Sequence, residues 1–214
     1  TLLMAVNKLG LDKIKQLVFS LEIIKLFSKT GVIDMTPFWK HSLAVANLAQ
    51  MLAVYSNLLM KNLGTAYLSG LMHDVGIMVF CYLIPDKYAA FLQSAAKKQI
   101  PFELQEEKVF GINHPKLGAY FIKKWWQVDP MIINAVEHHH VLCPPDSEQE
   151  QCRLMVHLAN KICIDHGQSN GIDCYTDEFN TQELEILSFS PEDIDRMTKD
   201  VKTAIAQSVS LLEN

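Results

Sequence analysis

Apolar residues recur every three or four positions along most of the chain, which is the spacing of an amphipathic helix. The first such stripe consists of Leu11, Ile14, Leu17, Val18, Leu21 and Ile24. A second runs through residues 38–63, where His41 shares the face of Ala44, Val45, Leu48 and Leu52. No useful length of chain alternates with the period of two that indicates a strand. The pattern therefore predicts an all-α fold, a bundle of many helices.

Proline, glycine and capping residues divide the rest of the chain into further helices. Pro85 ends an apolar helix that follows His73-Asp74, and Asp86 is predicted to cap the next helix, at 86–98. Gly111 is predicted to end a short helix at 101–110 in the left-handed conformation. Helices are also predicted from His114-Pro115, at 130–140, at 149–166 and from Ser190, with a polar loop at 167–180.

Composition places the chain among globular proteins, because 49% of its residues are hydrophobic and 20% are charged. The longest purely apolar run, residues 76–84, is about half the length of a membrane span. No signal peptide opens the chain. The five cysteines are odd in number and form no CxxC pair, which predicts free thiols in a reducing compartment. We therefore expect a cytoplasmic protein with no membrane partner.

Charge is divided unevenly along the chain. Residues 1–144 hold 14 basic and 10 acidic residues, whereas residues 145–214 hold 5 basic and 14 acidic residues. Neither part has a dense basic stripe with interleaved aromatic residues, so we expect no nucleic-acid partner. Residues 146–214 are predicted to form an acidic helical extension that packs on the same core. Its charge is read as a solvated surface, with partner docking as the alternative.

Histidines fall beside the apolar stripes of four separate predicted helices. They are His41, His73 with Asp74, His114, and His138 with His139. Imidazoles and a carboxylate that converge from different helices are how a helical bundle builds a metal site, and this donor set suits Fe, Mn, Zn or Ni. One or two such ions are therefore expected as the cofactor, since the carboxylate of Asp74 can bridge two ions.

Each residue also has a structural interpretation that stays open. His41 alone is typical of a core histidine bonded to a carbonyl group, and Asp74 alone could fix the tautomer of His73. His114 could cap a helix. Three consecutive histidines on a helix span about 200°, so at most two can face one site. His140 is therefore predicted to lie outside the cluster.

Four motifs, in this order and at these separations, resemble the HDOD domain. They are FWKHSLAVANLA at 38–49, GLMHDVG at 70–76, FGINHPKLGAYFIKKW at 110–125 and INAVEHHH at 133–140. The HDOD domain is a relative of the HD and HD-GYP metal-dependent phosphohydrolases. The resemblance covers about residues 5–165 and implies one domain over 1–214, an HD-like lobe. The helical lobe that precedes it in HDOD domains is expected to be missing, which fits a chain that starts at Thr1.

The resemblance implies a metal-ligand set of His41, His73, Asp74, His114, His138 and His139. It also marks two departures from the catalytic relatives. Ile77 stands where the HD-GYP proteins have a lysine, and Asn160 matches the position of a late aspartate ligand. Isoleucine supplies no charge to a phosphate, and an amide holds a divalent ion less well than a carboxylate. No catalytic residue is therefore assigned.

Three functions follow from these features. The first is a non-catalytic bacterial output or adaptor domain that acts on other signalling proteins, with a cluster that is structural or holds metal. The second is a working metal-dependent phosphohydrolase, acting on a nucleotide or cyclic dinucleotide. The third is a sensor that binds a nucleotide without cutting it. Ile77 and Asn160 favour the first, and the six ligand-like residues favour the second.

Overall fold

The computed structural model describes residues 11–27, 31–56, 63–96, 98–172, 183 and 186–212. Within those ranges no strand occurs, and the all-α prediction is confirmed. The α-helices, in chain order, are α2 (Leu11–Leu26), α3 (Met35–Tyr55), α4 (Leu63–Met72), α5 (Val75–Leu83), α6 (Pro85–Ala95), α7 (Phe102–Phe110), α8 (His114–Trp125), α9 (Pro130–His138), α10 (Glu148–Asp165) and α11 (Pro191–Leu212).

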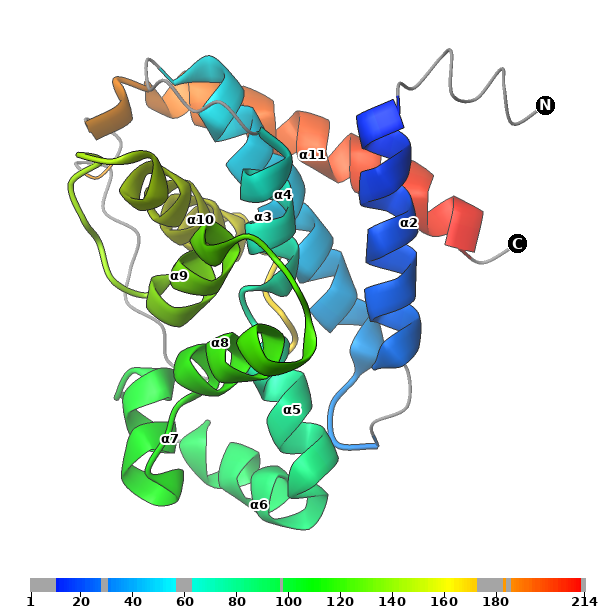
Figure 1. Cartoon of the computed structure of the whole chain (residues 1–214), viewed down its shortest axis with the longest axis vertical. Helices are drawn as coiled ribbons and strands as arrows, with labels where there is room; N and C mark the ends of the chain where they lie inside the picture. Colours follow the sequence, from blue (N-terminus) through cyan, green and yellow to red (C-terminus); the bar gives the residue numbers. More distant parts are fainter. Residues whose placement is uncertain are drawn as a thin grey trace.

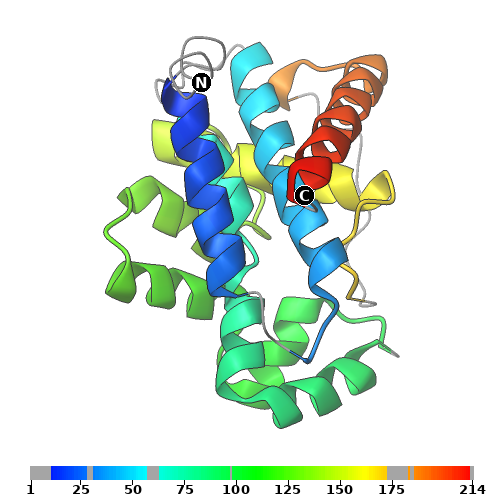
Figure 2. The same cartoon turned by 90° about the vertical axis from the view of Figure 1, so that its right-hand side faces the viewer.

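The helices form a larger and a smaller group (Figure 1). In the larger group α3 and α4 pack side by side, α9 and α10 pack on them, and α11 packs on α3. Figure 2 shows α3 between α2 and α11. The smaller group consists of α5, α6 and α7, and α8 joins the groups through contacts with α5 and α9. The turn His73-Asp74, between α4 and α5, therefore lies where the two groups meet.

Local signals in the sequence set most helix ends. Asp34 begins α3 by accepting a hydrogen bond from Thr36 N at 2.9 Å. Gly111 ends α7 with a φ of 74°, as predicted. The helix predicted at 38–63 ends earlier, because α3 ends at Tyr55; residues 57–62 lie outside the described part. Asp86 lies within the first turn of α6 and does not cap it, because Pro85 takes the first helical position.

Two glycines let the helices that carry the site approach one another closely. A Cβ atom on Gly70 would lie 2.8 Å from Ala46 Cα, so this glycine sets the spacing of α3 and α4. A Cβ atom on Gly76 would overlap the carbonyl oxygen of His114 and would lie 2.9 Å from Gly118 N. Protein interiors are close-packed, so a larger residue at position 76 would push α5 away from α8.

The core includes the most apolar part of the chain. The stretch Leu63–Leu83 is long and apolar enough to cross a membrane by length and composition alone, and is the one such stretch among the residues described. However, 83% of the most apolar 18 residues of this stretch is buried inside the protein. Met72, Ile77 and Met78 within it are fully buried. The stretch is thus packed as a core segment.

The C-terminal residues share this core. Leu187, Ile194, Met197 and Val201 belong to the same buried hydrophobic cluster as the residues of α3 and α4. Ser190 starts α11 through a reciprocal cap with Asp193, in which each backbone N–H donates to the other side chain, at 3.1 and 3.2 Å. Most of the predicted loop 167–180, including Cys174, lies outside the described residues. The cysteines that are described are free and buried: Cys81, Cys143, Cys152 and Cys163.

Candidate metal centre

Five of the six predicted ligands come together in one buried cluster. His41 comes from α3, His73 and Asp74 from the turn between α4 and α5, His114 from the first turn of α8, and His139 from the turn after α9. None of these residues is more than 3% exposed. A buried charge and several buried imidazoles are costly to desolvate unless they have partners, so the cluster requires an explanation.

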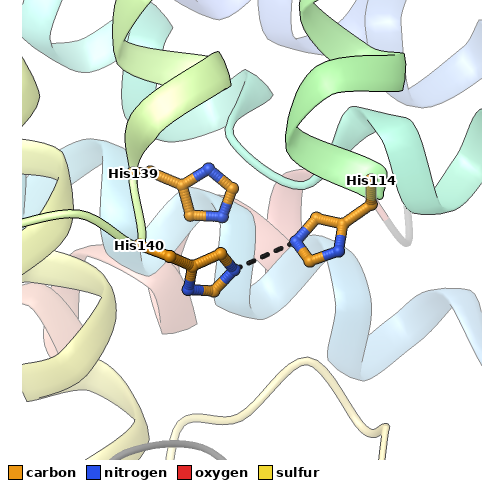
Figure 3. Close-up of side chains that lie close together, drawn as sticks. All are labelled: His114, His139 and His140. Atoms are coloured by element: carbon orange, nitrogen blue, oxygen red, sulfur yellow. Dashed lines mark hydrogen bonds between the residues drawn. The ribbon is translucent and has the colours of Figure 1, made fainter. Parts of the chain in front are cut away.

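His138 and His140 exchange the places that were predicted for them. The side chain of His138 is 39% exposed, and its Nε2 atom lies 4.0 Å from a carboxylate oxygen of the neighbouring Glu137. His140 instead points at the cluster, with its Nε2 atom 3.1 Å from His114 Nε2 (Figure 3). The prediction that His138 joins the cluster and His140 stays outside is therefore wrong. Its physical reason is that α9 ends at His138, so the helical rotation of about 100° per residue does not continue.

The carboxylate of Asp74 lies at the centre of the cluster. Its Oδ1 atom is 3.5 Å from both His114 Nε2 and His139 Nε2. Its Oδ2 atom is 3.3 Å from His73 Nε2 and 3.9 Å from His41 Nε2. Burial alone would raise the pKa of Asp74, but the surrounding His73, His139 and His114 hold this pKa well below its usual value. Asp74 is therefore an ionised carboxylate between two sets of imidazoles.

Each set includes three side chains whose potential ligand atoms lie within 4.8 Å of one another. One set is His41, His73 and Asp74, and the other is His114, His139 and His140. Figure 3 shows the second set, in which two rings from the end of α9 face the ring from the start of α8. Because Asp74 lies between the sets, its two oxygens are placed to serve both.

The orientation of four of the rings is fixed by hydrogen bonds at Nδ1. The acceptors are the carbonyl oxygens of Gln168 for His41 (2.6 Å), Gly70 for His73 (2.7 Å) and Val136 for His139 (2.8 Å), and the carboxylate of Glu106 for His114 (2.6 Å). Carbonyl and carboxylate oxygens only accept, so each Nδ1 carries the proton. A neutral ring of this tautomer presents a bare lone pair at Nε2.

The Nε2 atoms of these rings lie close to one another. His41 Nε2 and His73 Nε2 are 3.3 Å apart, and the buried Nε2 of His139 has no hydrogen-bond partner. Burial, followed by the charge of neighbouring His73, lowers the pKa of His41 to about 4. Burial lowers the pKa of His139 to about 4 as well. His41 and His139 are therefore neutral near pH 7.

The residues fit a transition-metal ion on chemical grounds. Imidazole nitrogens and a carboxylate oxygen are ligands of Fe, Mn, Zn and Ni. Ligand histidines in metal sites usually donate their other N–H to a carbonyl or carboxylate, which is the arrangement found at His41, His73, His139 and His114. His41, His73, Asp74, His114, His139 and His140 would hold the metal.

Glu106 is a part of the site that sequence reasoning missed. It is fully buried, and its Oε2 atom accepts hydrogen bonds from both the backbone N (2.7 Å) and the Nδ1 (2.6 Å) of His114. Its Oε1 atom accepts the Tyr88 hydroxyl at 2.6 Å. Burial would lower the pKa of His114, but Glu106 outweighs it and raises this pKa. A signal existed, since Glu106 lies between Phe102 and Phe110 on one helical stripe, where a charge is unusual.

A cavity of about 270 Å³ opens beside the cluster. Asp74, His114, His139 and His140 line one part of it, and Ile77 and Asn160 line it too. Asn160 is 5% exposed, and its Oδ1 atom lacks a hydrogen-bond partner. The cavity thus contains both positions at which the chain departs from the catalytic pattern: an apolar side chain at 77 and a free amide oxygen at 160.

The loop after α10 reaches back to the cluster. In addition to Gln168, which holds His41, Asn170 donates from Nδ2 to Asp74 Oδ2 at 2.9 Å. Trp125, at the end of α8, is 66% exposed, with Lys124 Nζ 5.4 Å from its ring. Trp126 is half-buried and packs edge-on against Phe121.

Fold and site together define an all-α domain with a buried His/Asp cluster built around an HD pair. The family model of the HDOD domain matches residues 1–142. The chain belongs to the HDOD domain family.

Solved structures with a similar fold come from several bacteria. An HDOD domain protein of unknown function from Geobacter sulfurreducens is 24% identical, with a TM-score of 0.73 over 96% of this chain and 70% of that one. A Marinobacter aquaeolei VT8 protein, assigned to signal transduction by inference, is 17% identical, with a TM-score of 0.75 over 96% of this chain and 46% of that one. The MmoQ response regulator of Methylococcus capsulatus is 21% identical, with a TM-score of 0.63 over 91% of this chain and 74% of that one. At these identities the similarity shows the fold.

The curated relatives are longer proteins. One from Mycoplasma genitalium, assigned by inference as a nicotinate-nucleotide adenylyltransferase/Ap4A hydrolase, is 29% identical over 125 residues, which are 58% of this chain and 31% of that protein. An uncharacterized Treponema pallidum protein is 23% identical over 156 residues, 73% of this chain and 30% of that protein. The chain spans about a third of the length of these relatives.

Proposed function

We propose that this domain is a bacterial, cytoplasmic signal-output or adaptor module that binds transition metal and acts on other signalling proteins without turning over a substrate. Membership of the HDOD family supports the signalling part, as does the similar fold of a response regulator and of a protein assigned to signal transduction. The metal would stabilise the meeting point of the two helix groups.

One observation carries the metal part of the proposal. Four buried histidines use Nδ1 as a donor, so their Nε2 atoms converge around the ionised carboxylate of Asp74. A purely structural hydrogen-bonded cluster would pair each acceptor with a donor, because unpaired buried acceptors cost free energy. Here His41 Nε2 and His73 Nε2 face each other at 3.3 Å, and His139 Nε2 has no partner.

Ile77 supports the proposal that the domain does not turn over a substrate. Phosphoester hydrolysis needs positive charge at the phosphoryl group in addition to an activated water. Ile77 is 1% exposed and lies on the cavity wall, at the position where catalytic relatives have lysine. Its side chain offers neither charge nor hydrogen bonds to a phosphate. The metal-binding residues are present, whereas this electrostatic aid to catalysis is missing.

The test is the metal content of protein purified without chelator, measured by mass spectrometry. We expect one or two equivalents of Fe, Mn, Zn or Ni in the wild type and loss of metal in a His73→Ala, Asp74→Ala double variant. His138→Ala is the matched control, since its side chain lies outside the cluster, and it should keep the metal. A wild type that stays metal-free after incubation with these ions would overturn the metal part.

A second candidate is hydrolysis of a phosphoric anhydride or ester. It is favoured by the similarity to the Mycoplasma genitalium protein assigned as an Ap4A hydrolase, and by the complete set of imidazoles around Asp74. The metal-loaded protein should be assayed with Ap4A, cyclic dinucleotides and simple phosphate esters. Turnover that disappears in Asp74→Ala would establish this candidate and refute the non-catalytic one.

A further inference from the structure

The two sets of potential metal ligands differ in their access to the cavity. The cavity is lined by all three residues of the second set, His114, His139 and His140. In the first set, which consists of His41, His73 and Asp74, neither histidine lines the cavity, and the two are only 1% and 0% exposed. An ion in the second set would therefore border the cavity, whereas an ion in the first set would be enclosed by the protein.

A short segment after α10 lies against the first set. This segment, residues 167–172, is here called the strap. The backbone carbonyl of Gln168 accepts a hydrogen bond from His41 Nδ1 at 2.6 Å, and Asn170 Nδ2 donates one to Asp74 Oδ2 at 2.9 Å. Oδ2 is the oxygen of Asp74 that lies nearer to His73 and His41. The strap thus holds two residues of the first set, which come from different elements of the fold.

The end of α10 sets the direction of the first of these contacts. Gly167 has a φ of 75° and ends the helix in a Schellman motif, in which Gly167 N donates to Ile164 O at 3.0 Å. In the same motif Gln168 N donates to Cys163 O at 2.8 Å. The two bonds fix the backbone at Gln168, so its carbonyl points at His41 without help from an ion.

The other end of the strap is held against the start of α3. Gly171 has a φ of 78°, and a Cβ atom there would lie 2.6 Å from Pro37 Cγ. The side-chain oxygen of Asn170 accepts a hydrogen bond from Ile172 N at 3.1 Å, which leaves its Nδ2 atom to donate to Asp74. Both ends are therefore fixed, and two hydrogen bonds attach the middle of the strap to the cluster. Movement of residues 168–170 away from the cluster is a local opening that leaves the helices in place.

We propose that the strap is the gate of the first set: an ion held by His41, His73 and Asp74 leaves or enters when the hydrogen bond between Asn170 and Asp74 breaks and the strap moves away. An ion held by the second set exchanges through the cavity instead. The inference deepens the proposed function and rests on its metal part. It gives two ions different roles, because the occupancy of the second set can follow the supply of metal while the ion of the first set stays in place.

The experiment measures how fast zinc leaves the zinc-loaded protein, from the absorbance of a chromogenic chelator added in excess. We expect a fast and a slow phase of about one equivalent each, one for each set of ligands. His140→Ala, which removes a ligand of the second set alone, should abolish the fast phase and keep the slow one. That variant assigns the phases to the two sets.

Two variants of the strap test the gate itself. Asn170→Ala should speed the slow phase about tenfold and leave the fast phase unchanged, because it removes one hydrogen bond to a charged group. Gly171→Ala should also speed the slow phase, since its Cβ would press on Pro37 and displace the strap. It does so without removing a group that contacts the first set.

Ser169→Ala is the matched control, because Ser169 belongs to the strap but is exposed, and its hydroxyl oxygen accepts only from Gly171 N, at 3.5 Å. Both of its rates should equal those of the wild type. The proposal is overturned if zinc leaves the wild type in a single phase, or if folded Asn170→Ala and Gly171→Ala release both equivalents at wild-type rates. Either result with a wild type that takes up zinc refutes only this inference. A wild type that takes up no zinc or other metal ion refutes the metal part of the proposed function, and this inference with it.

Discussion

Replacing Glu106 by glutamine tests whether a fully buried carboxylate orients one side of the His/Asp cluster. Glu106 accepts three hydrogen bonds, from the Tyr88 hydroxyl at 2.6 Å and from the backbone N and Nδ1 of His114 at 2.7 and 2.6 Å. Glutamine has nearly the same shape, but it has no charge and only one acceptor oxygen. At least one of the three donors must therefore lose its partner or reorient.

The size of the effect follows from these contacts. A hydrogen bond to a charged group contributes about 1.5–3 kcal/mol, and breaking a buried ionic contact costs about 3–5 kcal/mol. We expect Glu106→Gln to lower the free energy of unfolding of the metal-free protein by about 3 kcal/mol. Loss of a group that orients a metal-ligating histidine typically weakens metal affinity by about 10- to 100-fold, and we expect this at His114.

Urea denaturation of chelator-treated protein measures the first quantity, and competition with a chromogenic chelator measures the second. Glu107→Gln is the control, because Glu107 is the next residue on α7 and makes only an exposed ion pair with Lys116. That variant should change stability by less than about 1 kcal/mol and leave metal affinity unchanged. A folded Glu106→Gln protein with wild-type metal affinity would refute the orienting role of Glu106.

Three further predictions concern packing, acid and metal removal. In urea denaturation, Gly76→Ala should lower the free energy of unfolding by about 3 kcal/mol or more, because its Cβ would overlap the carbonyl oxygen of His114. Gly111→Ala should lower it by only about 1–2 kcal/mol, because position 111 has open space around it and is strained only by its φ of 74°. Metal-free protein should lose stability as the pH falls from 6.5 to about 4, by up to about 1.4 kcal/mol per pH unit for each of His41 and His139. Stability falls with falling pH because the folded-state pKa values of both histidines are about 4, so in this interval the unfolded chain takes up protons that the folded protein does not. Equal urea midpoints at pH 7.5 and 5 would contradict this prediction. Chelation should lower the melting temperature of the metal-loaded wild type by about 5–10 °C, and that of the His73→Ala, Asp74→Ala variant not at all.

Much of the fold and five members of the His/Asp cluster were predictable because they depend on local patterns. His41 shares a helical face with residues that are buried, and Asn113, Pro115 and Gly111 mark helix ends by their own backbone and side-chain chemistry. A histidine on the buried face of a helix must point into the core, whatever the neighbouring helices do. Periodicity therefore located these residues without knowledge of their contacts.

The remaining parts of the site depend on where helices end and on what packs across them. The end of α9 at His138 decides whether His138 or His140 joins the cluster. No proline or glycine at this point of the sequence indicates that the helix ends there. Trp125 ends α8 on its exposed face, so its nearness to His114 in the sequence did not bring it to the cluster. Asn170 reaches Asp74 from 96 positions away. Such a contact has no local signal.

The two departures from the catalytic pattern affect different capabilities of the site. Asn160 lines the cavity, and its Oδ1 atom is buried without a hydrogen-bond partner. The change from carboxylate to amide therefore removes charge but keeps an oxygen that could ligate a metal ion. Ile77 offers no polar atom at all. The imidazoles and Asp74 are held by hydrogen bonds that involve neither residue. Metal binding can therefore persist after the charge that assists phosphoryl transfer has been lost, which is the combination expected of a metal-holding signalling domain.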